Sequence, residues 1–239
     1  MNAKDEMSFL EHLEELRWHL LRAVMAILFF GSISFIFKDF IFDVIIFGPK
    51  NKDFFTYQLF CSISQNLGQG STFCIEEIPF RIQSRTVSGQ FSAHLWTSIL
   101  SGFIISFPYV IYEFWKFISP GLYDKEKKSA KGFIFISSIL FFIGVLFGYY
   151  IVAPLSINFL GTYSVSTQIF NDFDLSSYIG LVRASVLASG IIFELPIIIY
   201  FLTKVGIVSP EFLKKNRKIS LVLVLSLSAI ITPPDIASQ

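Results

Sequence analysis

Long apolar runs separated by short polar segments dominate the pattern along the chain. A membrane-spanning helix needs about 20 mostly apolar residues. Five runs approach or meet that length, at residues 20–37, 93–112, 132–153, 178–202 and 219–231. The last is short, because its helical length of roughly 20 Å falls below a hydrocarbon core of about 30 Å. The pattern predicts an all-α integral membrane protein, built as one membrane domain over residues 1–239 with five spans.

Composition supports the membrane class and excludes others. Of the 239 residues, 53% are hydrophobic and only 15% are charged, and a soluble domain of this size would expose large apolar patches. The net charge is +1 and no basic stripe carries interleaved aromatic residues, so nucleic acid is not an expected partner. An acidic stretch precedes the first run and no small-residue cleavage site follows it, which argues against a cleaved signal peptide.

Lys and Arg in the short loops predict the orientation. Segment 117–131 carries four of these residues and segment 204–218 carries five, whereas segment 154–177 carries none. Short loops rich in Lys and Arg stay in the cytoplasm. We therefore expect a cytoplasmic N-terminus, a long outside segment at 38–92 and, with five spans, an outside Gln239.

Two cysteines, Cys61 and Cys74, lie in the outside segment. In an oxidising compartment a disulfide between them is expected, and closing so short a loop contributes about 3 kcal/mol. Two free thiols are the alternative interpretation. No His accompanies the cysteines at metal spacing, so no metal site is predicted.

Acidic residues mark the cytoplasmic ends of the first spans. Residues 8–22 read "SFLEHLEELRWHLLR", and at 100° per residue Glu11 and Glu15 lie opposite the apolar face, with Glu14 beside them. Glu126 sits in the lysine cluster of segment 117–131. These carboxylates form either a solvated face, with Glu126 neutralising its lysines, or a docking site for a cationic ligand.

The fourth run contains two ionisable residues, Arg183 and Glu194, which are costly inside a bilayer. Glu194 lies in the predicted cytoplasmic half, and Pro196 frees a carbonyl one turn earlier, so a polar pocket is expected there. A Glu that reaches the headgroups is the alternative. An alternative function is a secondary transporter that uses Glu194 and Arg183 as a midplane pair, although no inverted repeat is seen.

Small residues and prolines shape the third run. Gly144 and Gly148 have the spacing that permits close helix packing, and Pro154 is expected to end this span. The three histidines show neither metal-ligand spacing nor a nucleophile constellation, so neither an enzyme nor a cofactor is predicted.

Four motifs, "HLEELRWHL", "FPYVIYEFWKFISPGLYDKEKK", "IIFELP" and "TPPD", occur in the order and spacing of one family. In these motifs the chain resembles TatC, the polytopic receptor subunit of the twin-arginine protein translocase. The resemblance implies a cupped bundle of six helices with both ends cytoplasmic. Five spans are visible here, so we expect a chain truncated before the sixth.

The resemblance also implies a role. TatC-like proteins of the cell inner membrane bind twin-arginine signal peptides, self-associate among membrane lipid, and assemble with TatA/TatB-type single-span subunits. Folded proteins then cross using the proton-motive force. By matching position, Glu15 and Glu126 would bind the arginines and Phe117 would line that site. Further matched residues are the supporting cytoplasmic-face group Glu11, Glu14, Arg17 and Glu113, the pocket residue Glu194, and Pro233, Pro234 and Asp235 of TPPD. Glu113 departs from many members, which carry Gln.

Overall fold

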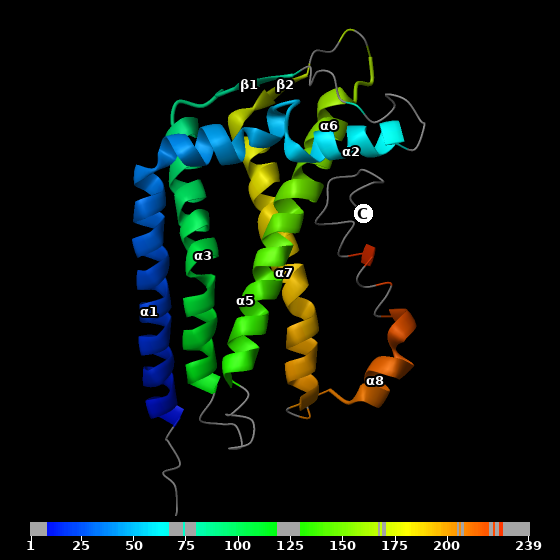
Figure 1. Cartoon of the computed structure of the whole chain (residues 1–239). Helices are drawn as coiled ribbons and strands as arrows, with labels where there is room; N and C mark the ends of the chain where they lie inside the picture. The colour runs from blue at the N-terminus through cyan, green and yellow to red at the C-terminus, as the bar shows by residue number, and fades with distance from the viewer. Residues whose placement is uncertain are drawn as a thin grey trace, which may run out of the picture. The chain divides into compact units, whose positions relative to one another are not determined.

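The computed structural model describes residues 9–66, 74, 80–118, 130–166, 168, 171–204, 206, 208–219, 222 and 225–226 (Figure 1). Within them, four helical stretches are long and apolar enough to cross a membrane. They are His12–Ile36, Gly89–Ile118, Gly132–Thr162 and Leu175–Lys204. The predicted class, a helical multi-pass membrane protein, is confirmed. Most of the fifth run, 219–231, lies outside the described residues.

The long helices are α1 (Phe9–Ile36), α3 (Gly89–Ile118), α5 (Ala130–Phe147) and α7 (Leu175–Lys204). The predicted outside segment 38–92 is itself folded. It holds the π-helix η1 (Phe40–Ile46), the short 3-10 helix η2 (Gly48–Lys50), the helix α2 (Phe55–Asn66) and the strand β1 (Arg81–Gln83). The remaining elements are the π-helix η4 (Gly148–Val152), α6 (Ala153–Thr162), β2 (Asp172–Asp174) and α8 (Pro210–Lys215).

The chain forms two compact units. The first unit comprises residues 1–37 and 95–139, and the second comprises residues 38–94 and 140–239. In the first unit α1 and α3 approach closely at two glycines. A Cβ on Gly102 would lie 2.5 Å from both the Gly31 nitrogen and the Ile27 carbonyl oxygen, so no larger residue fits there. One membrane domain over 1–239 stays a prediction.

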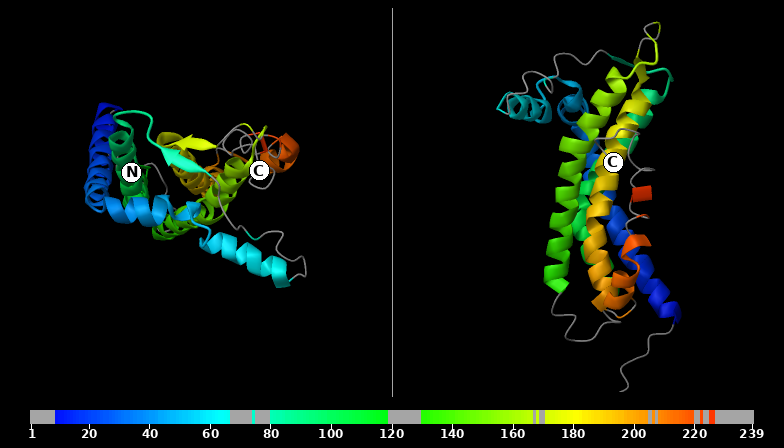
Figure 2. Two further views of the ribbon diagram at one scale, coloured as in Figure 1. Left: turned by 90° about the horizontal axis from the view of Figure 1, so that it is seen from above. Right: turned by 90° about the vertical axis from the view of Figure 1, so that its right-hand side faces the viewer.

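In the second unit, α5 and η4 pack against α7 through the predicted glycine pair (Figure 2). A Cβ on Gly144 would lie 2.6 Å from the Ser189 carbonyl oxygen, and one on Gly148 would lie 2.5 Å from that of Ser185. These contacts are possible only without side chains. The expectation of close packing at the Gly144-x-x-x-Gly148 spacing is therefore confirmed.

Pro154 does not end the third span, contrary to the sequence expectation. The helix continues as α6 to Thr162, with Pro154 in the first turn of that element. A proline removes the N–H that would bond the carbonyl four residues earlier, here that of Tyr150. The Thr56 hydroxyl from α2 donates to the Tyr150 carbonyl instead. The neighbouring Tyr57 hydroxyl lies 2.9 Å from the Pro154 carbonyl oxygen, which further ties α2 to this turn.

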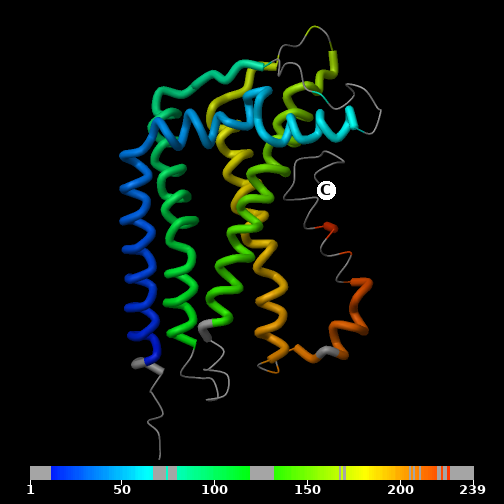
Figure 3. Tube along the Cα trace, in the orientation of Figure 1, coloured from blue at the N-terminus to red at the C-terminus, as the bar shows by residue number. Residues whose placement is uncertain are grey.

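A short parallel pairing joins β1 to β2, with Arg81 opposite Asp172 and Gln83 opposite Asp174. The two segments are far apart in the sequence but come together along the chain trace (Figure 3). Hydrogen bonds from the Ser176 hydroxyl and from the Arg85 backbone N–H lower the pKa of the Asp174 carboxyl. That carboxylate therefore keeps its charge, and these bonds, to lower pH than an ordinary Asp. Elsewhere in the second unit a disulfide joins Cys61 to Cys74, the pairing that the sequence led us to expect.

Candidate functional site

One face of α1 carries four polar side chains at helical spacing: His12, Glu15, His19 and Arg22. Residues three or four apart lie on the same side of a helix. The His12 ring stacks on the Phe117 ring of α3, with 4.5 Å between the ring centroids. This contact shows that the polar face of α1 lies against the end of α3, within the first unit.

The centre of the cluster is Glu113 of α3, which is only 3% exposed. The His19 Nδ1 atom lies 2.5 Å from the Glu113 carboxylate, and the Arg22 guanidinium lies 3.8 Å from the same oxygen. Tyr109 also forms a side-chain hydrogen bond to Glu113. A buried carboxylate is tolerated when it is paired and hydrogen-bonded. These partners satisfy Glu113, so it is a structural link between α1 and α3 rather than a free ligand.

Glu15 lies between the two histidines that contact α3, and its side chain is exposed. Glu14 and Arg17, on the same two turns of α1, are exposed as well. No ion pair is found for these three side chains among the described residues. The arrangement therefore leaves the Glu15 carboxylate at the surface, on the helix face whose two histidines contact the Phe117 ring.

The structure brings together part of the predicted site. Phe117 is half-buried at the α1–α3 contact, one turn beyond Glu113. Glu11 belongs to α1, but the described side chains begin with His12. Glu126 and the TPPD residues Pro233, Pro234 and Asp235 lie outside the described residues. Their predicted roles stay predictions.

The sequence reasoning missed His12 and His19. Both were considered only as metal ligands or catalytic groups, and neither contact to α3 was foreseen. A signal was available, because His12, Glu15, His19 and Arg22 follow the 3-4-3 spacing of one helix face. That spacing marks a polar face, but it does not identify the partner helix.

Glu194 lies in α7 of the second unit and is 7% exposed. Arg183 is half-buried on the same helix, about 16 Å away by helical rise. This separation excludes a direct pair between the two side chains, so the midplane pair that a transporter would use is not formed. In the part of the chain that the structure describes, no group of three or more His, Cys, Asp or Glu is placed to hold a metal ion.

Four long apolar helices, with a polar cluster at the ends of two of them, define a multi-pass membrane protein. Residues 11–239 match the model of the family described as Sec-independent protein translocase protein (TatC). The chain belongs to the TatC family and is a membrane component of a protein translocase.

Individual relatives agree. The TatC protein of Blattabacterium sp. subsp. Periplaneta americana is 46% identical, over 99% of this chain and 90% of the relative. That of Aquifex aeolicus is 33% identical, over 98% of this chain and 87% of the relative. Two crystal structures of a twin arginine translocase receptor, TatC, one of them in DDM, superpose with TM-scores of 0.70 and 0.72. They are 30% and 31% identical, over 95% of this chain and 90% and 91% of theirs. Family membership displaces the secondary-transporter alternative.

Proposed function

We propose that this chain is the receptor of a twin-arginine translocase, and that it binds twin-arginine signal peptides at the α1–α3 cluster. The observation that carries the proposal is the exposed Glu15, which lies on α1 between His12 and His19, the two histidines whose rings contact Phe117 of α3. The likeness to two crystal structures of a twin arginine translocase receptor supports the same role.

The chemistry of the side chains accounts for a preference for arginine. A guanidinium is a planar fork of donors that a carboxylate engages with two parallel hydrogen bonds, and its flat face stacks on aromatic rings. Glu15 supplies one carboxylate, Glu126 supplies the second, and Phe117 supplies the ring. Lysine offers only a point charge on a flexible stem, so it fits this site less well. Glu11, Glu14 and Arg17 surround the site and tune the local charge.

The remaining parts of the proposal concern transport. Once the signal peptide is bound, the chain assembles with TatA/TatB-type single-span subunits and with copies of itself, and folded proteins cross using the proton-motive force. Glu194 forms a polar pocket within the membrane, separate from the carboxylates that bind arginine. The burial of Glu194 in α7, a helix that carries none of the cluster residues, supports a different role for it.

Site-directed crosslinking of a labelled twin-arginine peptide to the membrane-embedded chain tests the proposal. Glu15→Ala and Glu126→Ala should each weaken the apparent affinity about tenfold, because each removes a charge-assisted hydrogen bond of about 1.5–3 kcal/mol. Glu211→Ala in α8, another exposed acid next to a basic segment, is the matched control and should change nothing. A twin-lysine peptide should crosslink poorly to the unmodified chain. Equal crosslinking of all three variants would exclude docking at this cluster.

A further inference from the structure

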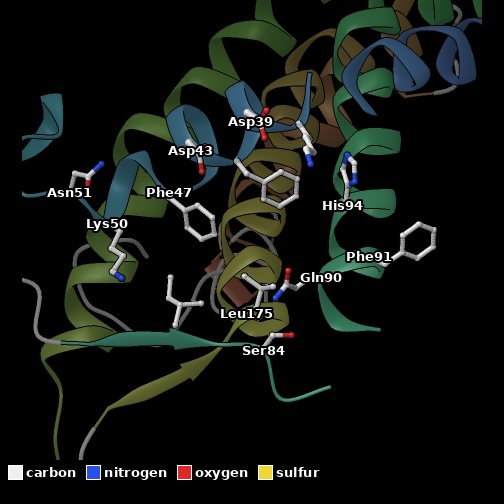
Figure 4. A pocket seen from close by; sticks show the side chains of 13 residues that line it. Asp39, Asp43, Phe47, Lys50, Asn51, Ser84, Gln90, Phe91, His94 and Leu175 are labelled. Atoms are coloured by element: carbon white, nitrogen blue, oxygen red, sulfur yellow. The ribbon is translucent and has the colours of Figure 1, made fainter. Parts of the chain in front are cut away.

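A second polar site lies at the other end of α3. A pocket of about 810 Å³ is lined by residues of η1 and η2, of the segment around β1, and of the first turns of α3 and α7. Figure 4 shows Asp39 and Asp43 on one side of it, Lys50 beside them, and Gln90 and His94 across from Lys50. All lining residues belong to the second unit. The volume falls in the range of small-molecule sites.

The pocket contains charges of both signs, contributed by Lys38, Asp39, Asp43 and Lys50. Within the described part of the chain, no ion pair neutralises any of these four. The Lys50 ammonium lies 5.6 Å from the centroid of the Phe80 ring. Carboxylates repel a simple anion and ammonium groups repel a simple cation. A ligand that carries one positive and one negative charge is attracted both by the two aspartates and by the two lysines.

The segments that line the pocket adjoin the ends of candidate membrane spans. The first span ends at Ile36, two residues before Lys38, and the second and fourth spans begin at Gly89 and Leu175. Residues just beyond the end of a span enter the headgroup region of the bilayer. We therefore expect the pocket to face lipid headgroups.

Apolar side chains adjoin the charges. Phe42, Phe91 and Leu175 line the pocket, and Phe91 is 64% exposed. In η1, Phe40 and Val44 are exposed next to the charged positions. Acyl chains therefore have apolar surface to lie against while the headgroup occupies the pocket.

We propose that this pocket binds the headgroup of a zwitterionic phospholipid, a phosphoethanolamine. The ammonium of the headgroup binds Asp39 and Asp43, and its phosphate binds Lys50 and Lys38, all through charge-assisted hydrogen bonds. The aromatic side chains contact the glycerol and the first part of the acyl chains. The proposal is independent of signal-peptide binding, which concerns residues of the first unit.

Native mass spectrometry of the delipidated full chain tests the proposal with short-chain phosphatidylethanolamine and phosphatidylglycerol as probes. The unmodified chain should bind the ethanolamine lipid more tightly. Asp39→Asn combined with Asp43→Asn should weaken that lipid at least about tenfold and reverse the preference, because only cations then face the ligand. Lys50→Met should weaken both lipids. Retained preference in the double aspartate variant, or no preference in the unmodified chain, would overturn the proposal.

Matched controls come from the adjacent turn. Lys52→Met and Asp53→Asn remove the same charges from exposed residues that do not line the pocket, and neither should change binding.

Asp39 is the N-cap of η1 but makes no side-chain cap bond, so the variants should fold. The single Asp43→Asn variant, which leaves this cap untouched, serves if the double variant melts early. Glycerophosphoethanolamine, which has no acyl chains, should bind more weakly than the lipid. Equal binding would assign the pocket to a soluble zwitterion and overturn the lipid assignment.

Discussion

Glu113 lies in the α1–α3 cluster, beside the proposed binding site, and its own partners already satisfy its carboxylate. Its carboxylate is buried and is shared by His19, Arg22 and Tyr109. Removing one partner of a buried charge costs more than the net contribution of the pair, because the other charge stays desolvated. The contact between His19 and Glu113 therefore limits which residues are tolerated at positions 19 and 113.

We predict a thermodynamic coupling between His19 and Glu113. His19→Ala should destabilise the protein by about 1–3 kcal/mol, because it leaves a buried carboxylate with weaker partners. Glu113→Gln should cost less, since a neutral amide is easier to bury and still bonds His19. The double variant should be more stable than the sum of the two single changes predicts. Thermal unfolding in detergent micelles measures all three.

Arg17→Ala is the control for this cycle, because Arg17 is exposed on the same helix and does not contact Glu113 in the described structure. The changes in unfolding free energy caused by Arg17→Ala and Glu113→Gln should add. If the changes caused by His19→Ala and Glu113→Gln also add, the 2.5 Å contact between His19 and Glu113 contributes no coupling.

The contacts around the candidate site were predictable only in part. Motif resemblance proposes Glu15 and Phe117 as binding residues, which stays a prediction, and marks Glu113 as a departure from the usual Gln. The pairing of His19 with Glu113 was not found, because it joins residues 94 positions apart and depends on how two helices meet. A single sequence gives the polar face of each helix, but the partner across the interface is a property of packing.

The contact between η4 and α7 is set by the absence of side chains. At Gly148 a single added carbon would meet the Ser185 carbonyl oxygen, and backbone cannot move aside as a flexible side chain does. In lipid, where apolar burial gives no net driving force between helices, such close backbone contact is a main source of association.

Gly148→Leu is therefore expected to lower the free energy of unfolding by about 1–3 kcal/mol, the usual cost of overpacking. Gly132→Leu is the matched control on the same span, where a Cβ meets nothing within 4 Å. Leu has a better helix propensity than Gly by up to about 1 kcal/mol, so the control should be neutral or slightly stabilising. Destabilisation by Gly148→Leu but not by Gly132→Leu in thermal unfolding would support the contact. Equal destabilisation by the two variants would contradict it.

Spans were easier to predict than their ends. Apolar runs of sufficient length identified four helices, because the bilayer sets a minimum length that composition alone reveals. The end at Pro154 was wrong, because Thr56 of α2 supplies the missing hydrogen bond to Tyr150. That donor lies almost a hundred positions away in the sequence, so local rules at a proline were bound to fail here. The folded elements within 38–92 were missed for a similar reason, since their apolar contacts are to other segments.

For the whole molecule, the charge distribution predicts which surface faces the cytoplasm. The α1–α3 cluster and α8 belong to segments that adjoin Lys and Arg, whereas the disulfide and the β1–β2 pairing belong to segments predicted to lie outside. A disulfide persists in an oxidising compartment, which agrees with that assignment. The signal-peptide binding proposed above requires this orientation, because the peptide would arrive from the cytoplasm.

The native cysteines Cys61 and Cys74 and one introduced cysteine together allow the orientation to be measured. In intact spheroplasts, a membrane-impermeant reductant should open the Cys61–Cys74 disulfide. An impermeant maleimide added afterwards should then label both thiols, because their segment is predicted to lie outside. Glu211→Cys places a thiol on exposed α8 without altering the Lys and Arg count, and this thiol should react only after the membrane is permeabilised. The predicted orientation would be wrong if the α8 thiol were labelled at once and Cys61 and Cys74 were labelled only after permeabilisation. That result would also place the α1–α3 carboxylates on the side of the membrane where no signal peptide arrives.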